Sequence, residues 1–473
     1  MAHQTLARRH AEFAANLRTS DIPPEVRKGA LLHLVDSLGV SIAGAAEGEE
    51  SGAVGRALAK KWATPEGATV YGVGSLMRPE MAALVNGSMA QALEMDDKHG
   101  SSLARPGSTV VPAVMAVAEE RNASIADALT AIVAGYETMI RLGFVARDRF
   151  LERGYHTSCL IGGFGAVAGV GRLGNHSADE IVSALGIAGT MASGIQESTR
   201  TGSTSKIIHG GWGAHSGIVA MDLASAGITG PESVYEGKMG FFQTHLTPIK
   251  GELEWDTAGA GLGSVWHLLD TAFKPYPCCQ LMHAFIEAAK QILVDMARDR
   301  MDVAAIEAIH CKLAEPGLTL VTEPRERKLA PELRHEARFS LPFVVASALF
   351  YGDIGLESFS DERLSSQTIR ALAARITTAE DPESDYPAHC PARMEVKVAG
   401  RTYTKHVPFH PGSPEAALSP ADVLDKFARN TRWLFGNRAH DTAEALLEIP
   451  EAESVARIVT LLSEAAATSM QRA

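Results

Sequence analysis

The chain has 473 residues, of which 46% are hydrophobic and 21% are charged. This length exceeds that of one ordinary domain and the composition is that of a globular protein, so we expect two domains and no extensive disorder. The formal net charge is −12 and no lysine- or arginine-rich run occurs, which argues against a nucleic-acid partner. A protein of this charge that binds an anion must gather its cations in one place.

Cysteine usage and hydropathy indicate a cytoplasmic protein. The five cysteines are odd in number and scattered, which favours reduced thiols over a disulfide framework. The first residues contain charges and no apolar segment of the kind found in secretory signals. No stretch approaches the roughly 18 uncharged apolar residues of a membrane span, so we expect no membrane partner.

From Pro23 to about Leu223 the apolar residues recur at spacings of three and four, which predicts helices. Ser177 and Glu180 fit a capping box, and Ser124 with Asp127 forms an acidic variant of it. Small residues at 162–171 would let neighbouring helices approach closely. The clearest helical patterns lie at residues 26–45, 83–95, 110–120 and 126–143.

The pattern changes near residue 268. Residues 303–313 are compatible with a strand, residues 392–407 alternate around an Ala399-Gly400 turn as a hairpin does, and residues 341–350 are helical. Helical periodicity returns after a Pro/Gly-rich stretch at 410–415. We therefore predict a mostly α fold with an α+β part: a large all-helical domain, 1–267 and 412–473, interrupted by a smaller α+β domain at 268–411.

One acidic cluster follows an apolar helix. Residues 94–99 contain three carboxylates, a lysine and a histidine, and Arg105 precedes a Pro-Gly turn. Such groups on a loop bind ligands in many proteins, although a solvated helix end has the same composition. A metal site is disfavoured because Lys98 would oppose the ion, so we expect no metal.

Three other segments carry candidate binding groups. His156 precedes a glycine-rich helix start, where it would bind an anion or lie in the core. Lys206 lies between a polar loop and an apolar stretch; if buried it needs an anionic partner, and if not it is an ordinary solvated lysine. Lys274 opens the α+β segment and would stand at the interdomain crevice. Cys278 has no adjacent activating histidine, which favours a structural role over a nucleophile.

These groups together suggest a pocket for a polycarboxylate. Each lies beside a turn or a helix end of an otherwise acidic chain. The five are Lys98, Arg105, His156, Lys206 and Lys274.

The chain resembles the MmgE/PrpD family over nearly all its length. The resemblance rests on an ordered set of short motifs: Asp36-Ser-Leu-Gly, Asn86-Gly, the Glu94-Met-Asp-Asp segment with Arg105-Pro-Gly after it, Tyr155-His-Thr-Ser followed by Gly-Gly-Phe-Gly, the stretch 205–217, the stretch 274–284, and Phe339-Ser-Leu-Pro-Phe. It implies a homodimer, a helical domain with a smaller lid domain, an active site in the crevice between them, and no metal or organic cofactor. The activities it implies are dehydration of 2-methylcitrate, decarboxylation of cis-aconitate and epimerisation of iminodisuccinate, all at a carbon beside a carboxylate.

Four positions depart from the family pattern. Glu94 replaces an aspartate, Lys98 a threonine, Arg105 a histidine, and Phe343 a tyrosine that is often functional. Arginine does not shuttle protons near neutral pH, which counts against decarboxylation of cis-aconitate itself.

We therefore predict a cofactor-free lyase or isomerase that abstracts a proton beside a carboxylate of a small di- or tricarboxylate, in the manner of 2-methylcitrate dehydratase. His156 is the preferred acid or base, and a lysine of lowered pKa is the alternative. The rival hypotheses are an iminodisuccinate-type epimerase and a family member that binds a polycarboxylate without catalysis. The candidate catalytic residues are His156, Lys206, Lys98, Asp96 and Asp97; the candidate substrate-binding residues are Lys274, Arg105, Glu94, His99 and Tyr155.

Overall fold

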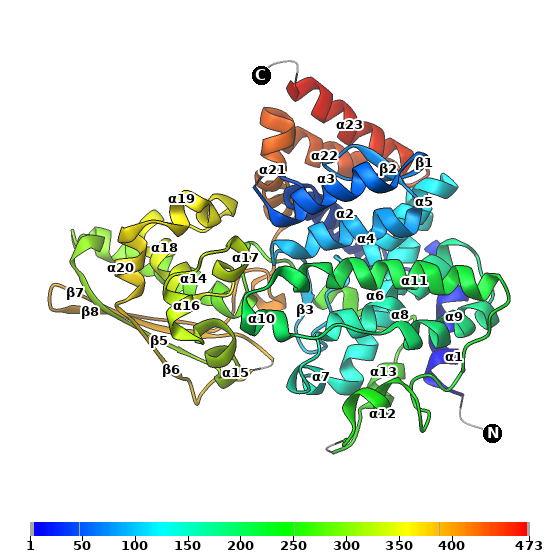
Figure 1. The fold of residues 1–473 in the computed structure, drawn as a ribbon, viewed down its shortest axis with the longest axis horizontal. Coiled ribbons are helices and arrows are strands. Elements are labelled where there is room, and N and C mark those ends of the chain that lie inside the picture. Colours follow the sequence, from blue (N-terminus) through cyan, green and yellow to red (C-terminus); the bar gives the residue numbers. More distant parts are fainter. Residues whose placement is uncertain (1–3, 47, 250, 387, 471–473) are drawn as a thin grey trace.

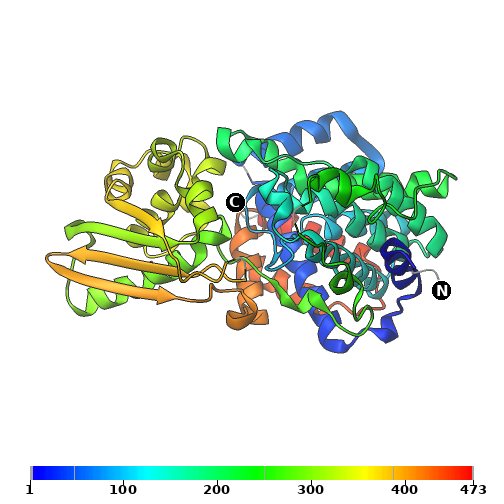
Figure 2. The same cartoon turned by 90° about the horizontal axis from the view of Figure 1, so that it is seen from below.

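The chain folds into a large helical part and a smaller part that contains a sheet (Figures 1 and 2), and each part has its own hydrophobic core. The computed structural model describes residues 4–470, except residues 47, 250 and 387. One core is built from residues 6–268 and 427–465, and the other from residues 276–407. The fold is thus mostly α with a smaller α+β part, as the sequence predicts. The domain boundaries at 267/268 and 411/412 stay predictions.

The helical part surrounds α6, Ile125–Ala146. Within the described residues, α6 alone is long and apolar enough to cross a membrane, but its apolar window is entirely buried in the protein, where it packs on α8. The C-terminal helices, orange to red in Figure 1, pack on α2 and on one another. The other helices of this part are α1 (Leu6–Asn16), α2 (Pro24–Gly44), α3 (Glu50–Trp62), α4 (Pro79–Ala92), α5 (Val110–Arg121), α7 (Arg149–Glu152), α8 (Thr157–Leu173), α9 (Ala178–Met191), α10 (Glu197–Thr201), α11 (His209–Ser225), α12 (Phe241–Leu246), α13 (Trp255–Gly259), α21 (Pro420–Phe435), α22 (Ala439–Glu448) and α23 (Ala456–Met470).

Short strands interrupt the helical part. The predicted helical stretch contains an antiparallel hairpin, β1 (Ala63–Val70) with β2 (Ser75–Met77), which periodicity did not reveal. Most of β1 is exposed or half-buried without strict alternation, so it lacks the pattern that identifies a strand. A second pair, β3 (Lys98–His99) with β4 (Thr271–Ala272), joins the acidic cluster to the segment that enters the α+β part.

The α+β part is a four-stranded mixed sheet with helices on one face (Figure 1). The strand order is β6-β5-β7-β8, with β5 parallel to β6 and antiparallel to β7. The strands are β5 (Ile306–Leu313), β6 (Ile376–Glu380), β7 (Ala392–Val398) and β8 (Arg401–Val407). The helices are α14 (His283–Arg298), α15 (Glu315–Gly317), α16 (Arg325–Leu329), α17 (Arg334–Ala337), α18 (Leu341–Tyr351), α19 (Asp361–Leu364) and α20 (Gln367–Ala373).

The predicted hairpin is confirmed. β7 and β8 pair in antiparallel register, and every second residue of β7 from Ala392 is buried. Ala399 and Gly400 both have positive φ, 47° and 78°, as a two-residue hairpin turn of the primed type requires. The strand expected at 303–313 begins at Ile306, after one 3₁₀ turn.

A buried ion pair connects the two parts. Arg338, just after α17, is fully buried, and its Nη2 donates to both carboxylate oxygens of Glu49 at 3.0 and 2.9 Å. Glu49 precedes α3 of the helical part and also receives Arg334 at 3.4 Å. Because both charges are out of water, each depends on the other.

Glu49→Gln therefore tests this connection. The amide keeps the shape but leaves the Arg338 guanidinium buried without a counter-charge, so the free energy of unfolding should fall by about 3–5 kcal/mol in urea denaturation. The double variant Glu49→Leu/Arg338→Met removes both charges and should recover part of the loss. A Glu49→Gln protein as stable as the wild type would contradict the assigned role.

Candidate functional site

The acidic cluster begins where α4 ends. After the last turn of α4, Glu94 adopts left-handed backbone with φ 53°, a conformation that non-glycine residues rarely adopt. The carboxylate of Glu94 is fully buried. Backbone strain of this kind is retained where the surroundings over-determine it, and here the determinant is a set of cations.

Glycines bring α4 and α11 close enough for those cations to meet Glu94. A methyl group at Gly211 of α11 would overlap the carbonyl of Leu84, and one at Gly87 of α4 would meet the backbone of Gly211 at 2.7 Å. The two helices therefore pack backbone to backbone. This contact places the 3₁₀ turn Thr204–Ile208, which precedes α11 and carries Lys206, beside the end of α4.

Three cations converge on the Glu94 carboxylate. Lys206 Nζ donates to Oε1, Arg105 donates to Oε2 at 2.8 Å, and Lys274 Nζ lies 3.7 Å from Oε2. Lys274 also donates to the backbone carbonyl of Glu94 at 3.1 Å. Burial disfavours the charged form, but Arg105, Lys206 and Lys274 together hold the pKa of Glu94 well below its usual range.

Asp96 completes this network. Its Oδ1 lies 3.3 Å from Arg105 and 3.7 Å from Lys274, and its Oδ2 accepts from Ser108 at 2.8 Å. Burial, and then the positive charge of Arg105, lower the pKa of Lys274 to about 8. The carboxylates of Asp96 and Glu94 raise this pKa and offset only part of the decrease. Lys206 is buried, not solvated, and the anionic partner that its burial requires is Glu94.

Asp97 holds the loop in place. Its Oδ1 accepts the backbone N–H of Gly107 at 2.8 Å, and its Oδ2 accepts from Tyr136 at 2.7 Å and lies 2.8 Å from Nδ1 of His33. These bonds outweigh burial and lower the pKa of Asp97. They tie the Pro-Gly turn after Arg105 to α6 and α2.

His156 forms a pair with His209. The two Nδ1 atoms lie 3.1 Å apart, so one ring donates and the other accepts. Burial, then the charge of Lys206, lowers the pKa of both rings: to about 4 for His209, and well below the usual range for His156. Both imidazoles are therefore neutral at physiological pH.

A cavity between the two parts brings several of these groups to a common surface. Residues of the helical part form one wall and residues of the α+β part the other. Four of the ten candidate residues line it: Lys98, Arg105, His156 and Lys206. The other lining residues are Leu103, Leu151, Thr157, Gln196, Thr199, Cys279, Gln280, Leu281, Leu320, Phe339 and Tyr386.

Of the three cations that line the cavity, Lys98 has the fewest ion pairs. It forms no ion pair with any residue that the structure describes, whereas Arg105 and Lys206 are both bonded to Glu94. Its pKa is lowered, chiefly by burial and in part by Arg105. Lys206 also lies 5.0 Å above the ring of Phe339, on the opposite wall.

The other six candidates lie away from the cavity surface. Glu94, Asp96 and Lys274 are buried and do not line the cavity. Asp97 is also buried, where it holds the loop in place. His99 faces a different cavity, and the ring of Tyr155 contacts His245 at 5.4 Å between centroids.

Sequence reasoning missed several groups of the site. Cys279, in the stretch 274–284, lines the cavity, and His209, in the stretch 205–217, pairs with His156 without lining it. Neither side chain carries a fixed charge, which was the property that singled out most of the other candidates. Tyr386 brings a phenol to the cavity from the α+β part. Phe343 stands at the position where a tyrosine is common. Its ring packs in the α+β core, with its centroid 6.0 Å from that of Phe359. Phe343 does not line the cavity, so the replacement of tyrosine removes no hydroxyl from the cavity surface.

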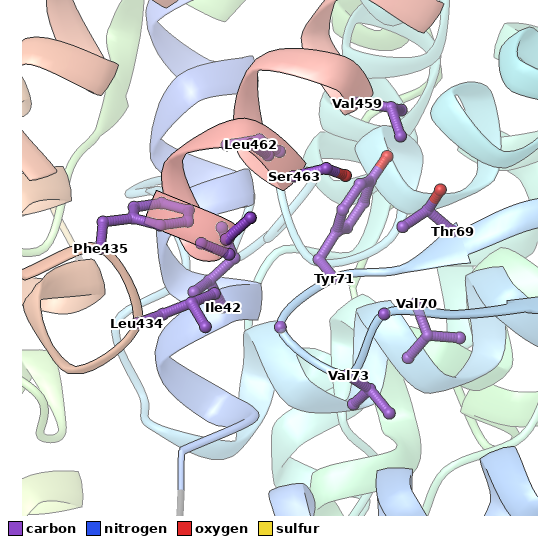
Figure 3. Close-up of a pocket in the computed structure, with 14 residues that line it drawn as sticks. Ile42, Thr69, Val70, Tyr71, Val73, Leu434, Phe435, Val459, Leu462 and Ser463 are labelled. Atoms are coloured by element: carbon purple, nitrogen blue, oxygen red, sulfur yellow. The ribbon is translucent and has the colours of Figure 1, made fainter. Parts of the chain in front are cut away.

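A second, apolar pocket shares no lining residue with this cavity, and its own lining residues are drawn in Figure 3. It is lined by the loop around Tyr71, the end of α2 and one face of α23. Tyr71 donates to Glu119 at 2.6 Å, so its hydroxyl is already satisfied. This pocket offers no acid, base or free cation among the residues described for it.

The chain belongs to the MmgE/PrpD family. Residues 8–253 match the model of the MmgE/PrpD N-terminal domain, and residues 276–449 match that of the C-terminal domain. The chain is 26% identical over 472 residues to a cis-aconitate decarboxylase-like protein of Aspergillus oryzae, covering 95% of this chain and 96% of that one. It is 27% identical to a cis-aconitate decarboxylase of Aspergillus terreus (82% and 80% covered) and 25% identical to that of Homo sapiens (80% and 78%).

The histidine pair predicts an acid-sensitive fold. Because His209 has a pKa of about 4 when folded and about 6.5 when unfolded, the unfolded chain binds more protons between these values. Stability should therefore fall as pH drops from 6.5 to 4, by about 3 kcal/mol for this residue. His209→Asn should lose that part of the dependence in urea denaturations at pH 7, 5.5 and 4.

The matched control is His215→Asn. His215 lies on the same helix, half-buried and bonded to the carbonyl of Glu80 at 2.9 Å. An unchanged pH dependence in His209→Asn would contradict the assignment of a buried neutral pair.

Proposed function

We propose that the protein is a lyase that acts on a small carboxylate in the cavity between its two parts. The observation that carries the proposal is the cavity wall of Lys98, Arg105 and Lys206 beside the neutral His156. Family membership and the names of the relatives support a lyase-type reaction. At 25–27% identity the relatives do not specify which reaction.

The cations would bind the substrate with the donors that Glu94 leaves free. A lysine has three N–H donors and an arginine five. Arg105 uses Nη1 for both Glu94 and Asp96, and Lys206 uses one N–H for Glu94. Lys98 has its whole ammonium available. Four cations against two carboxylates leave an excess of positive charge that suits a dicarboxylate.

His156 would act as the base once the substrate is bound. After burial, the charge of Lys206 contributes most to its lowered pKa, and Arg105 acts in the same direction. A bound carboxylate offsets both charges, so the pKa of His156 rises toward neutrality and the ring becomes a stronger base. The same cations would stabilise the negative charge that develops beside the carboxylate.

Dehydration of a 2-methylcitrate-like substrate remains our specific proposal. Elimination needs an acid for the leaving hydroxyl, and Lys98 or Tyr386 offers one from the cavity wall. Arg105 cannot take the part of a proton-shuttling histidine. An epimerase of an iminodisuccinate-like dicarboxylate is the second candidate, because His156 and Lys98 both line the cavity and would serve as the two bases it needs.

Incubation in deuterated water with citrate, 2-methylcitrate, cis-aconitate and iminodisuccinate, followed by NMR, tests the proposal. A new product with loss of water or carbon dioxide supports a lyase, and exchange with inversion alone supports the epimerase. Binding without exchange or product for every compound would favour a binding protein without catalysis.

Substitution of His156 should separate catalysis from binding. Loss of a general base typically lowers kcat by about 10²–10⁴-fold, so His156→Gln should lose that much with little change in KM. Lys98→Met removes a binding cation and should raise KM, and a fall in kcat beside it would assign the acid to Lys98 instead of Tyr386. His215→Gln serves as the control on a neighbouring helix, and equal losses in it and in His156→Gln would overturn the assignment.

The lid movement of the α+β part, the homodimer and the cytoplasmic location belong to the same proposal. The cavity has walls from both parts, so an opening between them would admit the substrate.

A further inference from the structure

A second cavity adjoins the first and has different chemistry. Lys98 and Gln280 line both cavities. The second is bordered by His99, His267 and Asp270 on one side and by residues 388–390 and 409–415 of the returning chain on the other. The two histidines and the aspartate each present one ligand atom, and these three atoms lie within 4.8 Å of one another.

The backbone holds these three side chains together. His99 ends β3, and His267 and Asp270 lie in a 3₁₀ turn, His267–Asp270, immediately before β4. β3 and β4 are paired, with His99 opposite Thr271. Nδ1 of His267 is 3.5 Å from Oδ2 of Asp270, and the rings of His99 and His267 meet edge to face at 6.1 Å between centroids.

We propose that His99, His267 and Asp270 form a site for a divalent transition-metal ion of the zinc class. Two imidazoles and one carboxylate are a usual ligand set for such ions and leave coordination positions for water. Ligand atoms on one tetrahedral ion are about 3.4 Å apart, so small side-chain rotations suffice to close the site. The site is separate from the cavity proposed for the substrate.

The three ligands range from buried to exposed: His99 is buried, His267 is half-buried and Asp270 is exposed. His99 Nδ1 accepts the backbone N–H of Ser102 at 3.3 Å, a long bond, and coordination through Nδ1 would replace it.

Charged residues of both signs line the cavity around the three ligands. Lys98 brings a positive charge to the cavity, and Glu415, which pairs with His389, brings a negative one. Bound metal would link β3, which carries Lys98, to the segment that leads into the α+β part. The expected effect is therefore stabilisation of this connection, with no role in the chemical step.

Metal titration tests the site without reference to any substrate. After chelator treatment and dialysis, Zn²⁺ is titrated calorimetrically and Co²⁺ by visible absorption. We expect one saturable site, a higher melting temperature with Zn²⁺, and at least a tenfold weaker affinity in both His267→Ala and Asp270→Asn. Asp270 is largely exposed, so Asp270→Asn should fold normally even if His267→Ala does not.

A second cluster supplies the matched control. His440, Asp441 and Glu444 also group their ligand atoms, but all three are exposed on α22. His440→Ala should leave the affinity unchanged. The proposal is overturned if no saturable binding occurs, or if binding persists in Asp270→Asn and disappears in His440→Ala. Because only metal binding is measured, failure here leaves the proposed lyase activity untouched, and the reverse also holds.

Discussion

The fully buried carboxylate of Glu94 is the constraint on which the site depends. An ionised carboxylate without water must be surrounded by cations and donors, since its desolvation is otherwise too costly. Three segments supply them: the loop after β3 brings Arg105, the turn before α11 brings Lys206, and the entry to the α+β part brings Lys274. The same ion network therefore fixes the helix ends, the loop and the connection between the two parts.

This arrangement explains how an acidic protein presents a positive cavity. Glu94 and Asp96 hold the cations in place while neutralising only part of their charge, and Lys98, Arg105 and Lys206 line the space between the two parts. The neutral pair of His156 and His209 is kept neutral by that charge and by burial. A bound anion would offset the charge of these cations and so raise the pKa of His156. Ligand binding would therefore increase the strength of the base.

Local features were predictable from the sequence because they depend on neighbours along the chain. Periodicity identified several long helices, among them α2, α4, α5 and α6, and the β7–β8 hairpin, and the capping box at Ser177 and Glu180 is present as predicted. The chemistry-bearing segments were recognisable because charged groups beside turns and glycines are unusual within apolar stretches. The β1–β2 hairpin was not predicted, because buried and exposed residues do not alternate along β1.

The partners of those groups were decided by the tertiary structure. Lys206 is 112 residues from Glu94, and His99 is more than 160 residues from His267, so no pattern along the chain connects them. Four of the ten predicted site residues line the cavity, while Tyr386 and His209 joined the site without any sequence signal. Residue types and spacing specify which chemistry a segment can offer; only packing, here the backbone contact of α4 and α11, specifies which segments share one space.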